Sequence, residues 1–255
     1  MNKIIRYVFV DLLRNKTILV YTLLLLVLSI SVYSMEDNYE KGLVSLLNIV
    51  LFVVPLVNIV FTSIYLYNSA EFINLLVSQP LKRTHIWLSI FIGLAGALTL
   101  SFIIGVAVPT FVYAFSISGL TLIGCGILLS LIFVSIAMWT SVLIRDKSKG
   151  IGLAILLWLY FGLLFDALVL FMLFQFSDYP IENLMVALSM FNPIDISRIL
   201  ILLELDLSAM MGYTGAIFRD FFGTALGMGI TLFVMLLWCI IPLWLSLRYF
   251  KKKDL

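Results

Sequence analysis

The stretch LVSLLNIVLFVVPLVNIVFTSIYL, residues 43–66, contains no charged side chain and decides the fold class. It exceeds the ~20 apolar residues that a helix needs to cross a bilayer core of roughly 30 Å. Similar apolar stretches occur at residues 17–35, 87–115, 120–144, 151–174 and 221–247. Charged residues make up 12% of the chain, too few to cover a soluble domain. The sequence therefore predicts an all-α membrane protein with six transmembrane helices in one domain, residues 1–255.

Lys and Arg are divided unequally between the segments that join the predicted spans. If both termini are cytoplasmic, all but three of the 16 basic residues lie on that side. The three exceptions are Lys41, Arg198 and Arg219. Cytoplasmic loops of membrane proteins carry such an excess of basic residues. We therefore expect a multi-pass protein of the cell inner (cytoplasmic) membrane with both termini in the cytoplasm.

Residues 1–16 precede the first span and have the pattern of an amphipathic helix. Apolar side chains recur at helical spacing on one side, and the other side carries Lys3, Arg6, Asp11, Arg14 and Lys16. Such a helix lies in the membrane interface, with its basic residues near anionic headgroups. A plain positively charged tail is the alternative. The first span has no A-x-A-type cleavage site, so we expect it to be retained as a helix.

The motifs of common catalytic and metal-binding sites are missing from the sequence. The single histidine, His85, has no neighbouring cysteine, and both cysteines lie inside predicted spans. A His/Cys metal site of the usual spacing is therefore not expected. The chain also lacks the G-x-x-x-x-G-K-[ST] loop that binds nucleotide phosphates. We expect a non-catalytic membrane subunit with no cofactor, no metal site and no nucleic-acid partner.

Methionines gather toward the predicted outer side, and their thioethers are ligands that suit Cu(I). They are Met172, Met185, Met190, Met210 and Met211. Methionine is also a common gap-filler in apolar helices, and no Met-x-x-x-Met pair occurs on a predicted membrane helix. Packing is the favoured interpretation, and direct copper handling is the alternative.

The predicted cytoplasmic loop at residues 67–86 is unusually rich in apolar residues for a connector. Glu71 precedes an apolar run, and Pro80 follows that run. Since proline disfavours a helical conformation in the residue before it, a short surface helix would end there. Such a helix would dock onto a partner protein or simply lie in the interface. The candidate docking residues are Glu71, Phe72, Gln79, Pro80, Leu81, Lys82 and Arg83.

Residues 175–220 join the last two predicted spans and are too many for a turn. Their moderate polarity favours one or two re-entrant or interfacial helices broken at Pro193. Asn192 would cap a helix that begins at Pro193. Asp195 and Arg198 are three residues apart on that helix, which suits a local ion pair. A structural role for these residues and a role as an outer gate or partner site both remain open.

Asp166 lies in the outer half of the fifth predicted span. An ionisable side chain inside a span is costly and usually faces protein or a water-filled cavity. We therefore consider Asp166 a candidate lumen or gating residue, and the alternative is a hydrogen-bonded acid near the outer interface. Asn58, in the second span, is a weaker candidate because helix packing explains its polar side chain equally well.

Several of these segments together resemble the ABC-2 type transporter permeases. The chain shares with them an N-terminal helix that ends in DLLRNK (residues 11–16), six spans, and a QPLKR sequence between the second and third spans. Three segments are most similar to the permeases of nitrous-oxide-reductase maturation systems. They are SQPLKRTHIWLSIFIGL (78–94), WLYFGLLFDALVL (158–170) and NPIDISRIL (192–200). The resemblance covers essentially the whole chain, and Phe165 replaces an expected tyrosine.

This resemblance implies the ABC-2 (type V) permease fold and a homodimer that binds two copies of a separate ABC ATPase subunit. Residues 1–16 would then form the elbow helix, and residues 67–86 would form the coupling loop. Residues 175–220 would face an outer partner, which in the nitrous-oxide-reductase systems is a periplasmic β-helical accessory protein. The expected role is transport or conformational work that supports assembly of the reductase's copper centre, with copper, a sulfur species, a lipid or no solute as the transported species.

Three other classes remain open at this stage. A generic ABC-2 exporter of a lipid, glycan or drug would share the elbow helix and the coupling loop. A passive channel of the aquaporin kind needs two Asn-Pro half-helices, and the chain has one Asn-Pro pair, at 192–193. A non-transporting membrane scaffold is the third class, and the apolar coupling-like loop argues against it.

Overall fold

The computed structural model describes residues 2–36, 38–176, 182–205 and 224–252, and these residues are helical with no strand among them. The ordinary helices are α1 (Asn2–Leu13), α2 (Lys16–Met35), α3 (Tyr39–Asn68), α4 (Ala70–Val77), α5 (Arg83–Phe102), α6 (Val108–Tyr113), α7 (Ile117–Leu143), α8 (Lys147–Leu159), α9 (Phe165–Gln175), α10 (Glu182–Ser189), α11 (Pro193–Glu204) and α13 (Ala225–Lys252). Two π-helical turns, η1 (Ile103–Ala107) and η2 (Tyr160–Leu164), lie inside longer helices.

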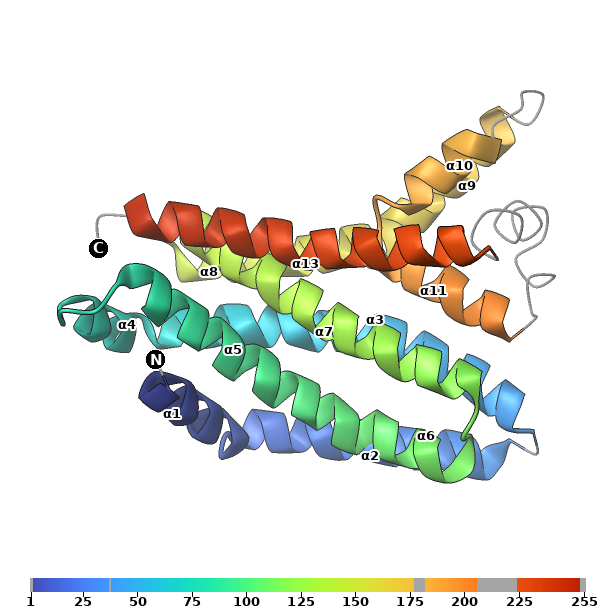
Figure 1. Ribbon diagram of the computed structural model, residues 1–255, viewed down its shortest axis with the longest axis horizontal. Helices are drawn as coiled ribbons and strands as arrows, with labels where there is room; N and C mark the ends of the chain where they lie inside the picture. The colour runs from blue at the N-terminus through green and yellow to red at the C-terminus, as the bar shows by residue number, and fades with distance from the viewer. Residues whose placement is uncertain (1, 37, 177–181, 206–223, 253–255) are drawn as a thin grey trace.

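Six helices are long and apolar enough to cross a membrane, which confirms the predicted number of spans. They are Lys16–Met35, Tyr39–Asn68, Arg83–Tyr113, Ile117–Leu143, Lys147–Met172 and Leu226–Lys252. The third span joins α5, η1 and α6, and the fifth joins α8, η2 and most of α9. The spans lie side by side, with α7 crossing the middle of the bundle and packing against both α3 and α13 (Figure 1).

Side-chain caps fix the beginning of most spans. The Asn15 side chain accepts a hydrogen bond from the Thr17 amide at the start of α2, at 2.9 Å. Ser116 does the same for the Gly119 amide at the start of α7, and Asp146 for the Lys149 amide at the start of α8. Each cap satisfies an amide that has no partner inside the helix. These short polar residues therefore separate consecutive apolar stretches into distinct helices.

The π-helical turn η1 is explained by the proline that follows it. Pro109 has no N–H, so it cannot donate to the carbonyl of Gly105 four residues earlier, and its ring crowds that carbonyl. The Ser29 hydroxyl of α2 donates to the Gly105 carbonyl instead, at 2.8 Å. A Cβ at Gly105 would lie 2.5 Å from Cβ of Leu25, so the missing side chain lets α2 approach. The irregular turn thus holds the first span against the third.

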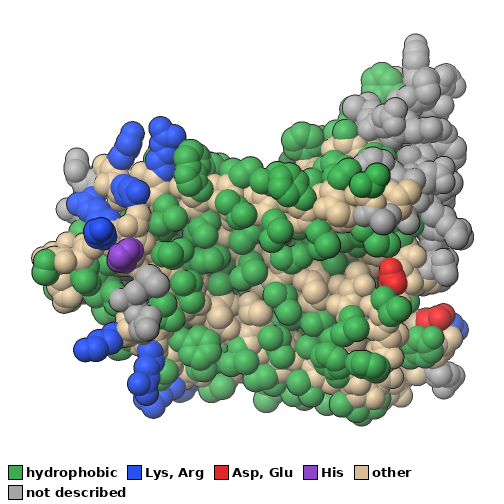
Figure 2. Space-filling model, in the orientation of Figure 1, with side chains coloured by type: hydrophobic (Ala, Val, Ile, Leu, Met, Phe, Trp, Pro, Cys, Tyr) green, Lys and Arg blue, Asp and Glu red, His purple; other side chains and the backbone are tan. Residues whose placement is uncertain are grey.

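Charged side chains are sorted between the two ends of the bundle, as Figure 2 shows for one face of the molecule. We call one end the basic end, and it is formed by α1, α4, the start of α5 and the ends of α7 and α13. The elements that meet there, which include the starts of α2 and α8, carry the basic residues Lys3, Arg6, Arg14, Lys16, Lys82, Arg83, Arg145, Lys147, Lys149, Arg248, Lys251 and Lys252. The opposite end carries α10 and α11, and α9 and α10 project from the bundle there (Figure 1).

The N-terminal amphipathic helix α1 packs on protein through part of its apolar side. Val8 and Leu12 are fully buried, and α1 lies along α5. A Cβ at Gly93 of α5 would lie 2.6 Å from Cγ1 of Val8, so this glycine allows the two helices to approach closely. The basic residues Lys3, Arg6 and Arg14 remain exposed on the other side. The apolar stripe that we expected to face the membrane interface is therefore partly covered by the third span.

Candidate functional sites at the two ends of the bundle

An ion-pair cluster lies at the end of the bundle opposite the basic end. The Arg198 guanidinium of α11 lies 2.7 Å from Oδ2 of Asp166 in α9 and 3.3 Å from Oδ1 of Asp195. We call these three residues the outer triad, after the side of the membrane on which the charge pattern of the sequence predicts them. The Arg198–Asp195 pair is the local pair that the three-residue spacing predicted. The pair with Asp166 joins the fifth span to α11 and could not be read from sequence spacing.

A second polar contact holds α11 against the same span. The Asn192 side chain accepts from the Ile194 amide at 3.0 Å, which is the helix cap predicted from the Asn-Pro sequence. Its Nδ2 also donates to the Phe161 carbonyl at 2.8 Å. Phe161 lies in η2, and a π-helical turn disturbs the regular i→i−4 bonding of the helix. Asn192 thus fixes the start of α11 beside the turn that precedes Asp166.

The outer triad lies at the edge of a cleft of about 520 Å³. The cleft is bounded by α2, α3, the fifth span and α11, and its polar lining residues are Asn48, Asp166 and Arg198. The side chains of Arg198 and Asp166 are 31% and 33% exposed there, and that of Asp195 is 12% exposed. Asp166 lies within the fifth span, where an ionisable side chain is costly against lipid. The cleft is therefore a place that water or another protein surface must cover.

Two carboxylates share one guanidinium in the outer triad. Burial raises the pKa of the Asp195 carboxyl above its usual range, and the neighbouring Asp166 carboxylate raises that pKa further. The Arg198 guanidinium opposes the rise. The Asp195 carboxyl therefore takes up a proton more readily than an isolated aspartate would, and its pKa depends on both Asp166 and Arg198.

Asn58, the other intramembrane candidate, lies in a different setting. Its side chain is fully buried in α3, and neither its Oδ1 nor its Nδ2 has a hydrogen-bond partner among the described residues. Thr62, one turn further along α3, is likewise buried with its hydroxyl unpaired in the described part of the chain. Asn58 does not line the cleft beside the outer triad.

At the basic end, α4 forms the short helix predicted between the second and third spans. Helix α3 ends at Asn68 and α5 begins at Arg83, so the connection is shorter than the predicted 67–86. Ile73 and Leu76 are buried, whereas Leu75 is 66% exposed. The other predicted docking residues Glu71, Gln79, Pro80, Leu81 and Lys82 are also exposed, and Phe72 and Arg83 are half-buried. The ring of Phe72 contacts that of Tyr7 in α1, with 5.1 Å between centroids.

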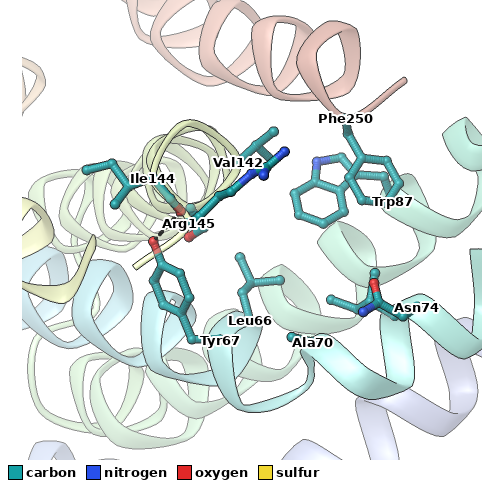
Figure 3. Close-up of a pocket in the computed structure, with 11 residues that line it drawn as sticks. Leu66, Tyr67, Ala70, Asn74, Trp87, Val142, Ile144, Arg145 and Phe250 are labelled. Carbon is teal, nitrogen blue, oxygen red and sulfur yellow. Dashed lines mark hydrogen bonds between the residues drawn. The ribbon is translucent and has the colours of Figure 1, made fainter. Parts of the chain in front are cut away.

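A pocket of about 310 Å³ lies between α4 and the ends of four spans (Figure 3). Its walls come from α3, α4, α5, the end of α7 with the segment that follows it, and α13. The Trp87 and Phe250 rings stack on one side of the pocket, and the Arg145 side chain extends across it toward them (Figure 3). The labelled lining residues are Leu66, Tyr67, Ala70, Asn74, Trp87, Val142, Ile144, Arg145 and Phe250. Sequence reasoning missed this pocket.

Tyr67 bridges two spans on the other side of this pocket. Its hydroxyl donates to the Ile144 carbonyl at 3.0 Å, shown as the dashed line in Figure 3. Gly150 of α8 faces the same ring, and a Cβ built there would clash with the Tyr67 hydroxyl. The absence of a side chain at position 150 therefore allows Tyr67 to reach Ile144.

Gly150→Ala is expected to break the Tyr67–Ile144 hydrogen bond and to lower thermal stability in detergent. The added methyl group displaces the phenol ring, and overpacking of this kind costs about 1–3 kcal/mol. Gly152→Ala is the matched control, because a Cβ at Gly152 has nothing within 4 Å. A melting curve for Gly150→Ala that coincides with that of Gly152→Ala would contradict this account.

The described residues contain no cluster of three or more His, Cys, Asp or Glu side chains that could hold a metal ion. Of the methionines considered for copper, Met185 is buried and Met190 packs against the core. Met210 and Met211 lie outside the described residues. The burial of Met185 and the packing of the half-buried Met190 against other apolar side chains fit the packing interpretation.

Six helices that can span a membrane, a short surface helix after the second and a polar cluster between the fifth and α11 define a multi-pass helical membrane protein. The chain belongs to the ABC-2 family of transporter proteins, because the family model described as "ABC-2 family transporter protein" matches residues 72–255. ABC-2 permeases are the membrane subunits of ABC transporters and work with ABC ATPase partners. This result confirms the family that the sequence segments indicated.

The chain is also similar to two curated proteins that share one description. The chain is 27% identical over 223 residues to the "Probable ABC transporter permease protein NosY" of Pseudomonas aeruginosa. The aligned residues are 79% of this chain and 81% of that protein. The chain is also 26% identical over 211 residues to the protein of the same description from Stutzerimonas stutzeri. These aligned residues are 74% of this chain and 76% of that protein. The similarity therefore extends over most of both chains.

Proposed function

We propose that this chain couples ATP hydrolysis by a separate ABC ATPase subunit to transport or conformational work, and that it does so as a homodimer in the inner membrane. The observation that carries the proposal is α4, a short helix at the basic end whose apolar Leu75 side chain is exposed. An exposed apolar residue on a helix that projects at this end suits a contact with the ABC ATPase partner of the family. The basic end is then cytoplasmic, because cytoplasmic loops concentrate Lys and Arg.

The ATPase would displace α4, and two contacts support a path from α4 into the membrane. Phe72 of α4 contacts Tyr7 of α1, and α1 packs along α5 through Val8 and Leu12. Helix α4 is also joined directly to α5 by a short segment that contains Pro80. Movement of α4 would therefore reach the third span both through the chain and through α1.

The outer triad suits a gate or a lumen surface in this proposal. Asp166 and Arg198 are about one-third exposed to a cleft at membrane depth, where exposure to lipid would be costly. A second copy of the chain packed over this cleft would shield the cleft from lipid and leave it filled with water. In that arrangement Asn192 and Pro193 position α11, and Arg198 holds α11 to the fifth span through Asp166, with Asp195 beside Arg198 on the same helix.

The similarity to two NosY permeases favours a particular role within this class. We propose that the chain supports assembly of the copper centre of nitrous-oxide reductase, with a periplasmic β-helical accessory protein as the outer partner. Among the described residues of that end, Asp195, Arg198 and the exposed Phe191 lie on or beside α11. A generic ABC-2 exporter is the alternative, and recovery of the ATPase without a β-helical protein would favour it.

Leu75→Asp is expected to reduce the amount of ATPase subunit that co-purifies with the chain by more than about tenfold. A central apolar contact in an interface contributes about 2 kcal/mol or more, and a buried carboxylate adds a desolvation cost. The measurement is a quantitative pull-down from membranes solubilised in mild detergent. Leu75→Met is the matched control and should retain the ATPase. Equal recovery with Leu75→Asp and Leu75→Met would exclude α4 as the docking helix.

A further inference from the structure

Trp87, near the start of α5, joins this helix to the end of α13 (Figure 3). Its Nε1–H donates to the Ser246 hydroxyl at 2.6 Å, and its ring stacks on that of Phe250 with 4.2 Å between centroids. All three side chains are buried. A directional hydrogen bond and a ring stack together fix both the distance and the orientation of the two helix ends.

A third contact reinforces the same junction from the solvent side. The Arg83 guanidinium donates to the Lys251 carbonyl at 3.3 Å. Lys251 lies in the last turn of α13, where carbonyl groups lack intrahelical partners and a positive charge is favourable. Residues 83 and 87 are one turn apart on α5, so successive turns of α5 hold the last two turns of α13.

The junction lies directly behind α4. Ile73 of α4 lines the same pocket as Trp87 and Phe250, so the stacked rings form the wall that faces α4 across the pocket. Helix α4 is also joined to α5 by the short segment 78–82. A displacement of α4 toward the bundle would therefore act on the α5–α13 junction rather than on α5 alone.

We propose that Trp87 is a positioning residue that makes the basic ends of α5 and α13 move as one body when α4 is displaced. The last turns of the sixth span then belong to the coupling machinery, together with α4 and α5. This inference rests on the proposed function, since it requires an ATPase partner that moves α4.

The test is a distance measurement between spin labels at the two helix ends. His85→Cys on α5 and Tyr249→Cys on α13 are exposed positions beside the junction. Ser148→Cys with Tyr249→Cys is the reference pair, which reports movement of α13 relative to α8. Cys125 and Cys239 are replaced by Ala in every variant. Distances are recorded for the complex with its ATPase, without nucleotide and with a non-hydrolysable ATP analogue.

We expect the 85–249 distance to stay the same when the analogue binds, while the 148–249 distance changes. In Trp87→Ala the 85–249 distance should shift or broaden on nucleotide binding, although the ATPase remains bound. Trp87→Phe keeps the ring stack but lacks the Nε1–H donor. The nucleotide-dependent change in its 85–249 distance should therefore be smaller than that in Trp87→Ala. Trp87→Phe also serves as the informative variant if Trp87→Ala does not fold.

Two results would overturn the inference while leaving the proposed function intact. The first is a nucleotide-dependent 85–249 distance in the chain that retains Trp87. The second is an unchanged 85–249 distance in the Trp87 variants. Co-purification of the ATPase is checked before labelling, so a failure of the proposed function is detected separately as a complex that does not form.

Discussion

Arg198→Ala is expected to cause a large loss of stability and to abolish the coupled activity of the complex. The substitution removes the only cation that contacts Asp166 and Asp195 in the described structure and leaves two carboxylates beside each other. Removing one partner of a buried pair costs about 3–5 kcal/mol, and we expect about 2–3 kcal/mol here because the side chains are partly exposed. The measurement is thermal unfolding of the purified chain in detergent, together with ATP hydrolysis by the complex.

A double-mutant cycle separates the ion pair from general damage to α11. Asp166→Asn removes the charge on the fifth span, and the double variant removes both partners of the 2.7 Å contact. If the two groups interact, the double variant should be less destabilised than the sum of the single variants. Arg198→Lys, which keeps the charge but loses the planar guanidinium, should fall between Arg198→Ala and the native chain. Additive effects within experimental error would contradict a direct Asp166–Arg198 interaction.

Gly126→Ala is expected to be the most damaging single-methyl change in the core of the bundle. A Cβ at this position of α7 would clash with the ring of Phe102, and Phe102 is fully buried in α5. Close packing leaves little space for the ring to move, so we expect a loss of about 3 kcal/mol, at the upper end of overpacking costs. The measurement is the midpoint of thermal or denaturant unfolding in detergent, compared between Gly126→Ala and the native chain.

Gly124→Ala is the matched control on the same helix. A Cβ at Gly124 has nothing within 4 Å, so this variant should be as stable as the native chain. A second variant tests the cause directly, because Gly126→Ala combined with Phe102→Leu should recover part of the lost stability. Equal unfolding midpoints for Gly124→Ala and Gly126→Ala would contradict the claim that Gly126 allows α5 and α7 to approach closely.

Local features of the chain could be predicted from the sequence. The six spans follow from length and hydropathy, which act on each segment separately. The cap at Asn192 and the Asp195–Arg198 pair depend on residues within one helical turn, so spacing alone was sufficient. The surface helix between the second and third spans was likewise readable from Pro80 and the apolar run before it.

Contacts between distant segments could not be predicted in this way. Asp166 and Arg198 are 32 residues apart, and Trp87 and Ser246 are 159 residues apart. Nothing in a single sequence indicates that such residues meet, because helix packing brings them together. The burial of Val8 and Leu12 against α5 shows the same limit, since an apolar stripe looks alike whether it faces lipid or protein.

The central claim is that this ABC-2 permease works with an ATPase at its basic end. The most direct measurement is purification of the native complex from membranes in mild detergent, with identification of its polypeptides and their stoichiometry by mass spectrometry. We predict two copies of this chain with two copies of a polypeptide that carries the G-x-x-x-x-G-K-[ST] phosphate-binding loop. Recovery of an intact oligomer of this chain with no nucleotide-binding polypeptide would contradict the claim.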